Sequence, residues 1–166
     1  KFLPSALNKI YRKTFLTDNL LTFPEHIFFE DQPFSYSCTL AANRVVCVPQ
    51  VVYHHYKRSG SIVQSFNQKN IDDMMTAYKM IKEYLQKNNI YKKFRFNYYS
   101  SLQHFYNLIV RQIFEFVPDE KSKKEYLKYS LIRLKEVIDI DEYIDFLSSE
   151  ELRKHIQPNI TDTTIY

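Results

Sequence analysis

Glycine is almost absent from this chain of 166 residues, in which Gly60 is the only one. A dinucleotide-binding fingerprint and a P-loop each need several glycines, so neither can be built here. Hairpins with tight primed turns are disfavoured for the same reason. Tryptophan is missing, and the two cysteines, Cys38 and Cys47, have no metal-ligand spacing and cannot form a disulfide framework. This cysteine usage favours a reducing compartment, and we expect a cytoplasmic location.

Long apolar runs and concentrated charge are missing as well. No run approaches the roughly 20 apolar residues that a membrane-spanning helix needs. The net charge is only +4, from 23 basic and 19 acidic residues. Such a mild excess suits phosphorylated ligands or an anionic membrane surface, but it falls short of the basic footprint of a nucleic-acid-binding domain. We therefore expect no nucleic-acid partner.

The sequence is rich in aromatic residues and in helical periodicity. It contains 13 Phe and 14 Tyr within a 45% hydrophobic composition, enough for a packed core. From Asn70 onward, apolar residues recur with the helical period in three stretches. We expect Asn70 to cap the first, Asn88 and Asn89 to end it, Pro118 to end the second, and Asp119 to cap the third, which should run through Ile138. The second helix should bury His104.

The chain before residue 66 mixes two kinds of pattern. A helical pattern runs from Gln32 to about Asn43, whereas residues 45–48 and 51–56 are β-branched and aromatic and predict two short strands. We therefore expect a mixed α/β part over residues 1–66 and a helical part over residues 67–157. Ser148 and Glu151 match a capping box for a last short helix, and residues 158–166 should form a frayed tail.

Two adjacent carboxylates, Glu30 and Asp31, lie inside an aromatic run, residues 28–34 (FFEDQPF). Phenylalanines on both sides predict partial burial, and a buried carboxylate costs several kcal/mol unless it is paired. Glu30 and Asp31 are therefore either structural acids held in salt bridges or functional residues of a site. Capping of the helix that follows is a sufficient structural explanation of Asp31, because Pro33 fits the first turn of that helix.

Four segments in this order carry a resemblance: residues 8–16 (NKIYRKTFL), 23–25 (FPE), 29–34 (FEDQPF) and 53–62 (YHHYKRSGSI). Together they resemble the C-terminal half of the catalytic domain of bacterial family-two glycosyltransferases, over roughly residues 5–66. These are inverting, nucleotide-sugar-dependent enzymes of the GT-A fold. The resemblance implies an α+β fold, mainly α, in which part of a GT-A-like domain precedes a helical bundle.

The resemblance also implies roles for individual residues. Asp31 matches the aspartate that acts as catalytic base toward the acceptor hydroxyl, and Glu30 matches its neighbour, which positions the acceptor or the base. Arg58 and His55 match residues near the donor pyrophosphate. The physics agrees, because a sugar hydroxyl is a poor nucleophile and a positioned general base contributes typically ~10²–10⁴-fold.

The donor-binding half of such an enzyme should precede this chain, which begins at Lys1 without a methionine and looks like a fragment. That half would bring the Asp-x-Asp motif and bind most of a divalent metal, manganese or magnesium. We expect the fragment to be inactive alone. Asp139-Ile140-Asp141 has the letters of the motif but lies in helical sequence, and we interpret it as helix-terminal acids.

The implied partners are a nucleotide-sugar donor and a saccharide or lipid-linked acceptor in cell-surface polysaccharide or glycolipid synthesis. Lysines near residues 121–128 allow contact with the inner face of a membrane, although solvated helix surface is their ordinary role. An alternative is that the helical part serves as an interaction or oligomerisation module, for example in a homo-oligomer.

Overall fold

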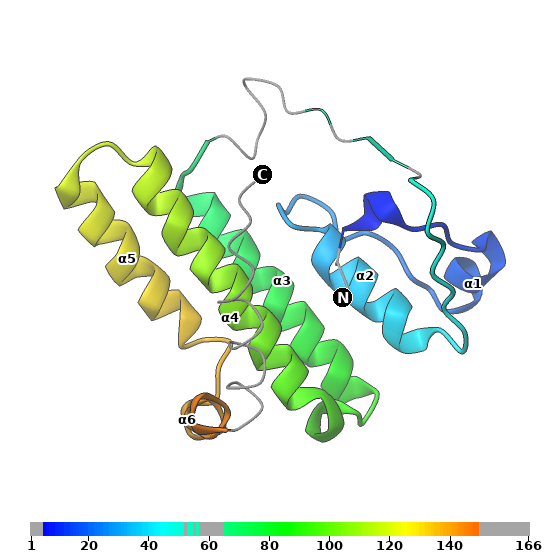
Figure 1. The fold of residues 1–166 in the computed structure, drawn as a ribbon. Coiled ribbons are helices and arrows are strands. Elements are labelled where there is room, and N and C mark those ends of the chain that lie inside the picture. Colours follow the sequence, from blue (N-terminus) through cyan, green and yellow to red (C-terminus); the bar gives the residue numbers. More distant parts are fainter. Residues whose placement is uncertain (1–4, 52, 55, 57–64, 150–166) are drawn as a thin grey trace.

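The computed structural model describes residues 5–51, 53, 54, 56 and 65–149, and every regular element among them is a helix (Figure 1). A short 3₁₀ turn and two helices come first, followed by four further helices. In chain order they are η1 (Ala6–Asn8), α1 (Lys13–Asp18), α2 (Asp31–Ala41), α3 (Gln68–Lys87), α4 (Tyr91–Phe116), α5 (Glu120–Leu134) and α6 (Ile140–Ser148).

The expected α+β fold is therefore wrong for the part of the chain that the structure describes. The predicted strand at residues 45–48 is irregular and exposed, with Val45 and Val46 each 66% accessible. The described residues of the second predicted strand, such as Val51 and Tyr53, are exposed too. The preference of β-branched residues for strands reflects packing against a sheet, and no neighbouring strand is present among the described residues to supply it. The assignment of a GT-A-like fold to residues 1–66 depended on these strands and is therefore wrong as well.

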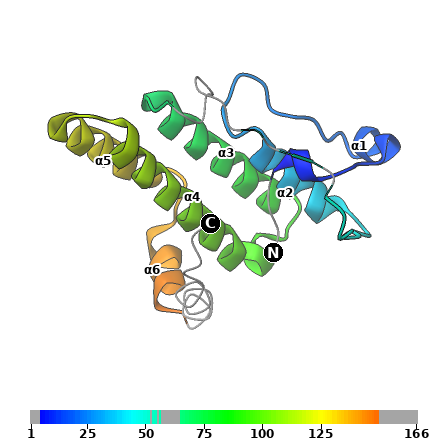
Figure 2. The same cartoon turned by 45° about the horizontal axis from the view of Figure 1, so that its top comes forward.

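Helix α3 lies at the centre of the molecule. It contacts α2 on one side and α4 and α5 on the other, while α6 packs on α4. Figures 1 and 2 show α3, α4 and α5 as a layer of nearly antiparallel helices, with α2 against one flank, α1 farther out beyond α2, and α6 across an end. The N-terminal part thus meets the helical bundle through α2 and through the loop that precedes it.

The helix ends follow local capping chemistry. Helix α3 begins earlier than predicted, because Asn67 is its N-cap and Asn70 closes the capping box from the third position. Its predicted end is confirmed, with Asn88 as C-cap and Asn89 in the left-handed region at φ 56°. Asp119 is confirmed as the N-cap of α5, where its side chain accepts a hydrogen bond from the Ser122 amide.

The helix expected to run through Ile138 ends earlier, and a separate helix that was not predicted follows it. Ser148 is the last residue of this helix and does not cap another one, so its predicted role is wrong, and Glu151 lies outside the described residues. Helix α5 ends at Leu134, and Asp139 caps the separate helix α6 by accepting from the Glu142 amide. Asp139 and Asp141 are thus helix-terminal acids, as interpreted. His104 is exposed on α4, so its expected burial is wrong.

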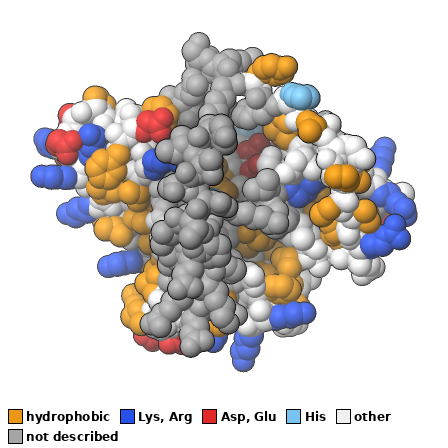
Figure 3. Space-filling view, in the orientation of Figure 1, with side chains coloured by type: hydrophobic (Ala, Val, Ile, Leu, Met, Phe, Trp, Pro, Cys, Tyr) orange, Lys and Arg blue, Asp and Glu red, His pale blue; other side chains and the backbone are white. Residues whose placement is uncertain are grey.

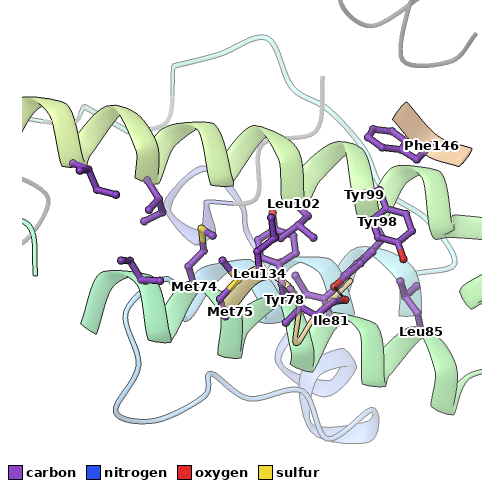
Figure 4. Packing of buried hydrophobic residues seen from close by; sticks show 14 of the residues in the cluster. Met74, Met75, Tyr78, Ile81, Leu85, Tyr98, Tyr99, Leu102, Leu134 and Phe146 are labelled. Atoms are coloured by element: carbon purple, nitrogen blue, oxygen red, sulfur yellow. Dashed lines mark hydrogen bonds between the residues drawn. The ribbon is translucent and has the colours of Figure 1, made fainter. Parts of the chain in front are cut away.

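The core lies between α3 and α4 and is closed by α5 and α6 (Figure 4). Tyr78 and Ile81 of α3 meet Tyr98 and Leu102 of α4, and Phe146 of α6 covers one end. These side chains are at most 2% exposed. Burying each large apolar side chain stabilises the fold by ~1.5–3 kcal/mol, which is why the apolar stripe of each helix faces this layer.

Tyrosine hydroxyls inside the bundle find hydrogen-bond partners. Tyr36 of α2 and Tyr78 of α3 both bond the Ser101 hydroxyl of α4, at 2.5 and 2.7 Å. Tyr91 and Tyr99 both donate to the Glu142 carboxylate of α6, at 2.5 and 3.1 Å. These bonds satisfy polar atoms that would otherwise be costly to bury, and they join four helices.

In the part of the chain that the structure describes, no helix combines the length and the apolar character needed to span a bilayer.

Candidate active site

The acidic pair lies where an irregular loop enters α2. Glu30 occupies the N-cap position without capping through its side chain, and Asp31 is the first residue of the helix. Asp31 is therefore one position further along than the predicted N-cap. Glu30 is exposed and Asp31 is half-buried, so the aromatic surroundings bury only one of the two carboxylates.

The loop that presents the pair is strained. His26 and Phe29 have positive φ angles, 64° and 62°, although neither is glycine. This conformation is unusual for a bulky residue, and each such residue costs of order 1–3 kcal/mol. Strain of this kind persists only where the surrounding structure enforces it, and it clusters at functional sites.

Helix α3 supplies the structure that enforces it. The Asp73 carboxylate, only 7% exposed, accepts a hydrogen bond from the Phe28 amide at 2.7 Å. Lys69 pairs with Asp73 at 2.6 Å, donates to the His26 carbonyl at 2.9 Å and lies 4.9 Å from the centre of the Phe28 ring. Lys69 and Asp73 thus fix both ends of the strained turn just before the acidic pair.

The surroundings of Asp31 raise the pKa of its carboxyl above the usual value. The largest cause is the loss of solvent around the half-buried group, followed by the negative charge of Glu30. The Gln32 side-chain amide and the Ala6 backbone act in the opposite direction. The dipole of α2 also favours the charged form, by ~0.3–1 kcal/mol, but desolvation decides the direction. Asp31 is therefore a stronger base than an ordinary surface aspartate.

Buried polar atoms without partners gather beside Asp31. Gln32, 5% exposed, leaves its side-chain carbonyl oxygen unbonded, and Ser35, fully buried, leaves its hydroxyl unbonded among the described residues. The buried Tyr11 hydroxyl is a third such atom. It lies near enough to Ser35 for that hydroxyl to lower the pKa of Tyr11, but the two do not meet in a normal hydrogen bond. Such orphaned atoms are rare in folded proteins and call for an explanation such as a ligand or water.

These atoms belong to one neighbourhood with Asp31. Gln32 and Ser35 follow Asp31 on α2, one and four positions later, and the Gln32 amide lies 3.5 Å from the Asp31 carboxylate. The Tyr11 ring packs edge-on against Phe34, with the ring centres 5.2 Å apart, and the charge of Asp31 contributes to the raised pKa of Tyr11. The site thus combines one basic carboxylate with three hydroxyl or amide groups suited to a polar, hydroxylated ligand.

The remaining predicted site residues are not assembled with Asp31. His55 and Arg58 lie outside the described residues. His26 faces the exposed Glu25 at 3.8 Å. Among the residues that the structure describes, no group of three His, Cys, Asp or Glu side chains gathers to hold a metal ion.

Sequence reasoning missed the residues that support the acidic loop. Asp73 and Lys69 are more than forty positions away from their partners in the loop. From the sequence, Asp73 was interpreted as a first-turn acid of a helix, and Lys69, just before the predicted cap, was given no role. Tyr11 and Ser35 carried no signal of their own. An aspartate on the apolar face of a helix, as Asp73 is beside Met74, was the one available hint.

A curated relative was found for this chain. The protein named "Putative glycosyltransferase EpsH" from Bacillus subtilis (strain 168) is 32% identical over 93 residues, which make up 53% of this chain and 26% of that protein. The match thus spans about a quarter of the relative's length. No family model matches the sequence, and no solved structure matches it significantly.

Proposed function

We propose that this chain is part of a glycosyltransferase and that Asp31 is the base that activates the acceptor hydroxyl. Three observations support the proposal. A relative at 32% identity bears the name of a glycosyltransferase. The motif segments around residues 8–16, 29–34 and 53–62 follow one another as in family-two enzymes. The observation that carries most weight is the raised pKa of a half-buried carboxylate on a strained, anchored turn.

The proposed reaction is a single displacement with inversion. The Asp31 carboxylate takes the proton of an acceptor hydroxyl. At the same time the oxygen of that hydroxyl forms a bond to the anomeric carbon of the donor sugar. The bond between that carbon and the phosphate oxygen breaks, and the nucleoside diphosphate leaves with the electron pair. A base with a raised pKa takes a greater share of the proton in the transition state, which is why enzymes tune such carboxylates upward.

Glu30 has a secondary part in this proposal. Its negative charge raises the pKa of Asp31, and its exposed carboxylate is free to accept hydrogen bonds from an incoming hydroxylated acceptor. Gln32 and Ser35 supply further hydrogen-bonding atoms beside it. This division assigns Asp31 to proton transfer and Glu30 to positioning.

The proposal also covers the donor side of the reaction. Arg58 and His55 would contact the diphosphate, since a guanidinium matches phosphate oxygens in two parallel hydrogen bonds. A manganese or magnesium ion would be bound by residues of a longer protein. The acceptor would be a saccharide or lipid-linked saccharide, met in the cytoplasm or at the inner face of the membrane.

The test compares two isosteric variants in the longest natural polypeptide that contains this chain. Asp31→Asn keeps the shape of the side chain and removes the base, so sugar transfer should fall by at least ~10²-fold at unchanged folding. Glu83→Gln, an exposed acid on α3, serves as the matched control and should transfer normally. Near-normal transfer by Asp31→Asn would show that the aspartate is not the base.

A further inference from the structure

Helix α5 presents a basic and apolar face to solvent. Residues three, four, seven and eight positions apart share one side of a helix. On α5 this side carries two exposed apolar residues, Leu131 and Ile132, each 52% accessible. The exposed lysines on the same side are Lys121, Lys124, Lys128 and, at the C-cap, Lys135, which outnumber the one exposed acid at its edge, Glu125. The opposite side of α5, with Ser130 and Leu134, is buried against α3 and α4.

Helix α6 presents an acidic and apolar face. Ile140, Ile144 and Leu147 are 56%, 57% and 47% exposed and form a stripe at the spacing of one helical face. The exposed carboxylates of Asp141 and Asp145 lie beside the stripe. Phe146, on the other side of α6, is buried against α4 and the core. An apolar stripe of this length on a short helix is more than scattered surface hydrophobicity.

The two faces are complementary in charge and alike in apolar content. Within the described residues, the four lysines of α5 and the two aspartates of α6 make no ion pair with any other side chain. In Figure 3, hydrophobic side chains lie next to Lys and Arg on the α5 side, where some acidic side chains are visible as well, and hydrophobic and acidic side chains lie together near α6. Only residues 135–139 separate the two helices, which lie at the same flank of the molecule in Figures 1 and 2. Each molecule therefore offers both halves of one contact.

We propose that two copies of this chain associate through these faces, with the α5 face of each copy on the α6 face of the other. A two-fold axis makes this contact twice and closes the assembly at a dimer. Leu131 and Ile132 would pack against Ile144 and Leu147, while Lys128 would meet Asp145. An anionic lipid surface is a poorer occupant, because it would attract the lysines of α5 but repel the aspartates beside the α6 stripe.

Charge-swap variants test the proposed pairing. Lys128→Glu places two acids opposite each other, and Asp145→Lys places two cations opposite each other. By sedimentation velocity over a concentration series of the 166-residue chain, each variant alone should dimerise at least tenfold more weakly than the wild type, because facing like charges are costly. An equimolar mixture of the two should recover a dimer, since a mixed pair has complementary charges in both of its contacts.

Matched controls carry the same charge changes away from these faces. Lys79→Glu and Glu83→Lys, both on the exposed side of α3, should dimerise like the wild type. Far-UV circular dichroism of every variant checks that the helices are retained.

Four outcomes would overturn the proposal. They are a wild-type chain that stays monomeric at every concentration, swaps that leave the dimer unchanged, a mixture that does not recover association, and a monomer that instead binds phosphatidylserine vesicles. None of these bears on the assignment of Asp31, because the transfer assay and the sedimentation experiment change different residues.

Discussion

The N-terminal elements and the helical bundle differ in how fully their buried polar atoms are hydrogen-bonded. In the described part of the bundle, buried tyrosine hydroxyls bond serine, glutamate or backbone partners. The exceptions are the Gln112 side-chain oxygen and the Arg133 Nε atom, and the latter still forms an ion pair with Asp72. Around α2, three buried polar atoms lack partners beside one carboxylate with a raised pKa. Of the four non-glycine residues with positive φ in the described part of the chain, three also precede α2, namely Leu20, His26 and Phe29.

This difference indicates which region is built for stability and which for chemistry. A satisfied, close-packed layer is what a scaffold requires, because each buried group then contributes to the free energy of folding. Strain, unbonded polar atoms and a desolvated charge all lower stability, and they persist where a functional requirement maintains them. Helix α3 joins the two regions, since its Asp73 holds the strained loop while its apolar face forms the core.

The largest expected effect comes from the core of the bundle. Leu102→Ala removes a fully buried side chain and leaves a cavity, so the free energy of unfolding should fall by about 2–5 kcal/mol. The same substitution at Leu20, which is 86% exposed in the N-terminal part, should change it by no more than about 0.5 kcal/mol. Urea denaturation monitored by circular dichroism gives both values. If both substitutions lowered the free energy of unfolding by similar amounts, the bundle would not be the more tightly packed region, and the proposed contrast would be wrong.

The junction between the regions should be next in size. Asp73→Ala leaves the Phe28 amide and Lys69 without their acceptor, at a cost of ~1.5–3 kcal/mol for hydrogen bonds to a charged group. Hydrogen exchange at the Phe28 amide should become faster, while amides in the middle of α4 change little. Glu83→Ala, an exposed acid on the same helix, is the control. Unchanged exchange at Phe28 would mean that Asp73 does not hold the loop.

The bundle should also be sensitive to alkaline pH. Burial raises the pKa of Tyr78 and Tyr98, so the folded state keeps their protons at a pH where the unfolded chain loses them. The folded state then binds more protons than the unfolded state, and stability must decrease as the pH rises above about 10, the usual tyrosine value. Tyrosinate absorbance at these positions should appear together with the loss of helix. Ionisation of every tyrosine before unfolding would contradict the buried network.

A smaller contrast separates the two thiols. Cys38 is buried in α2, and burial raises its pKa to about 11, whereas Cys47 is exposed. A thiol reagent at neutral pH should modify Cys47 readily and Cys38 at least ~100-fold more slowly, because Cys38 must wait for local opening. Single Cys→Ser variants identify which thiol reacts. Equal rates would show that α2 opens easily from α3.

The helices were predictable from the sequence because their caps and apolar spacing are local. Asn88, Pro118 and Asp119 mark boundaries that the structure confirms. The break between α5 and α6 was missed, because the apolar spacing runs on through Val137 and Ile138, although Asp139 caps α6 locally. The strands were predicted wrongly, because the β-branched residues 45–48 have the composition of a strand without, among the described residues, a sheet to join.

The candidate site was only partly predictable, because part of it depends on contacts between segments that are far apart in the sequence. An acidic pair among phenylalanines is visible in one short stretch, and the half-burial of Asp31 follows from it. The anchoring by Lys69 and Asp73, and the unbonded groups of Tyr11 and Ser35, arise from contacts between distant segments. Such contacts have no periodic signature in a single sequence.

The central claim is that the charge of Asp31 is maintained for chemistry at a cost in stability, and the free energy of unfolding of Asp31→Asn tests it most directly. The raised pKa means that the folded state disfavours the ionised carboxylate, so at neutral pH the variant should be more stable than the wild type. Solvent screening of the half-exposed group limits the gain to about 1 kcal/mol.

Urea denaturation across a pH series gives the result. The gain of Asp31→Asn should be present at pH 7 and should shrink toward zero as the pH falls through the raised pKa, because the wild-type carboxyl then becomes neutral too. A variant that is less stable than the wild type at pH 7 would contradict the account, since Asp31 would then be a structural charge.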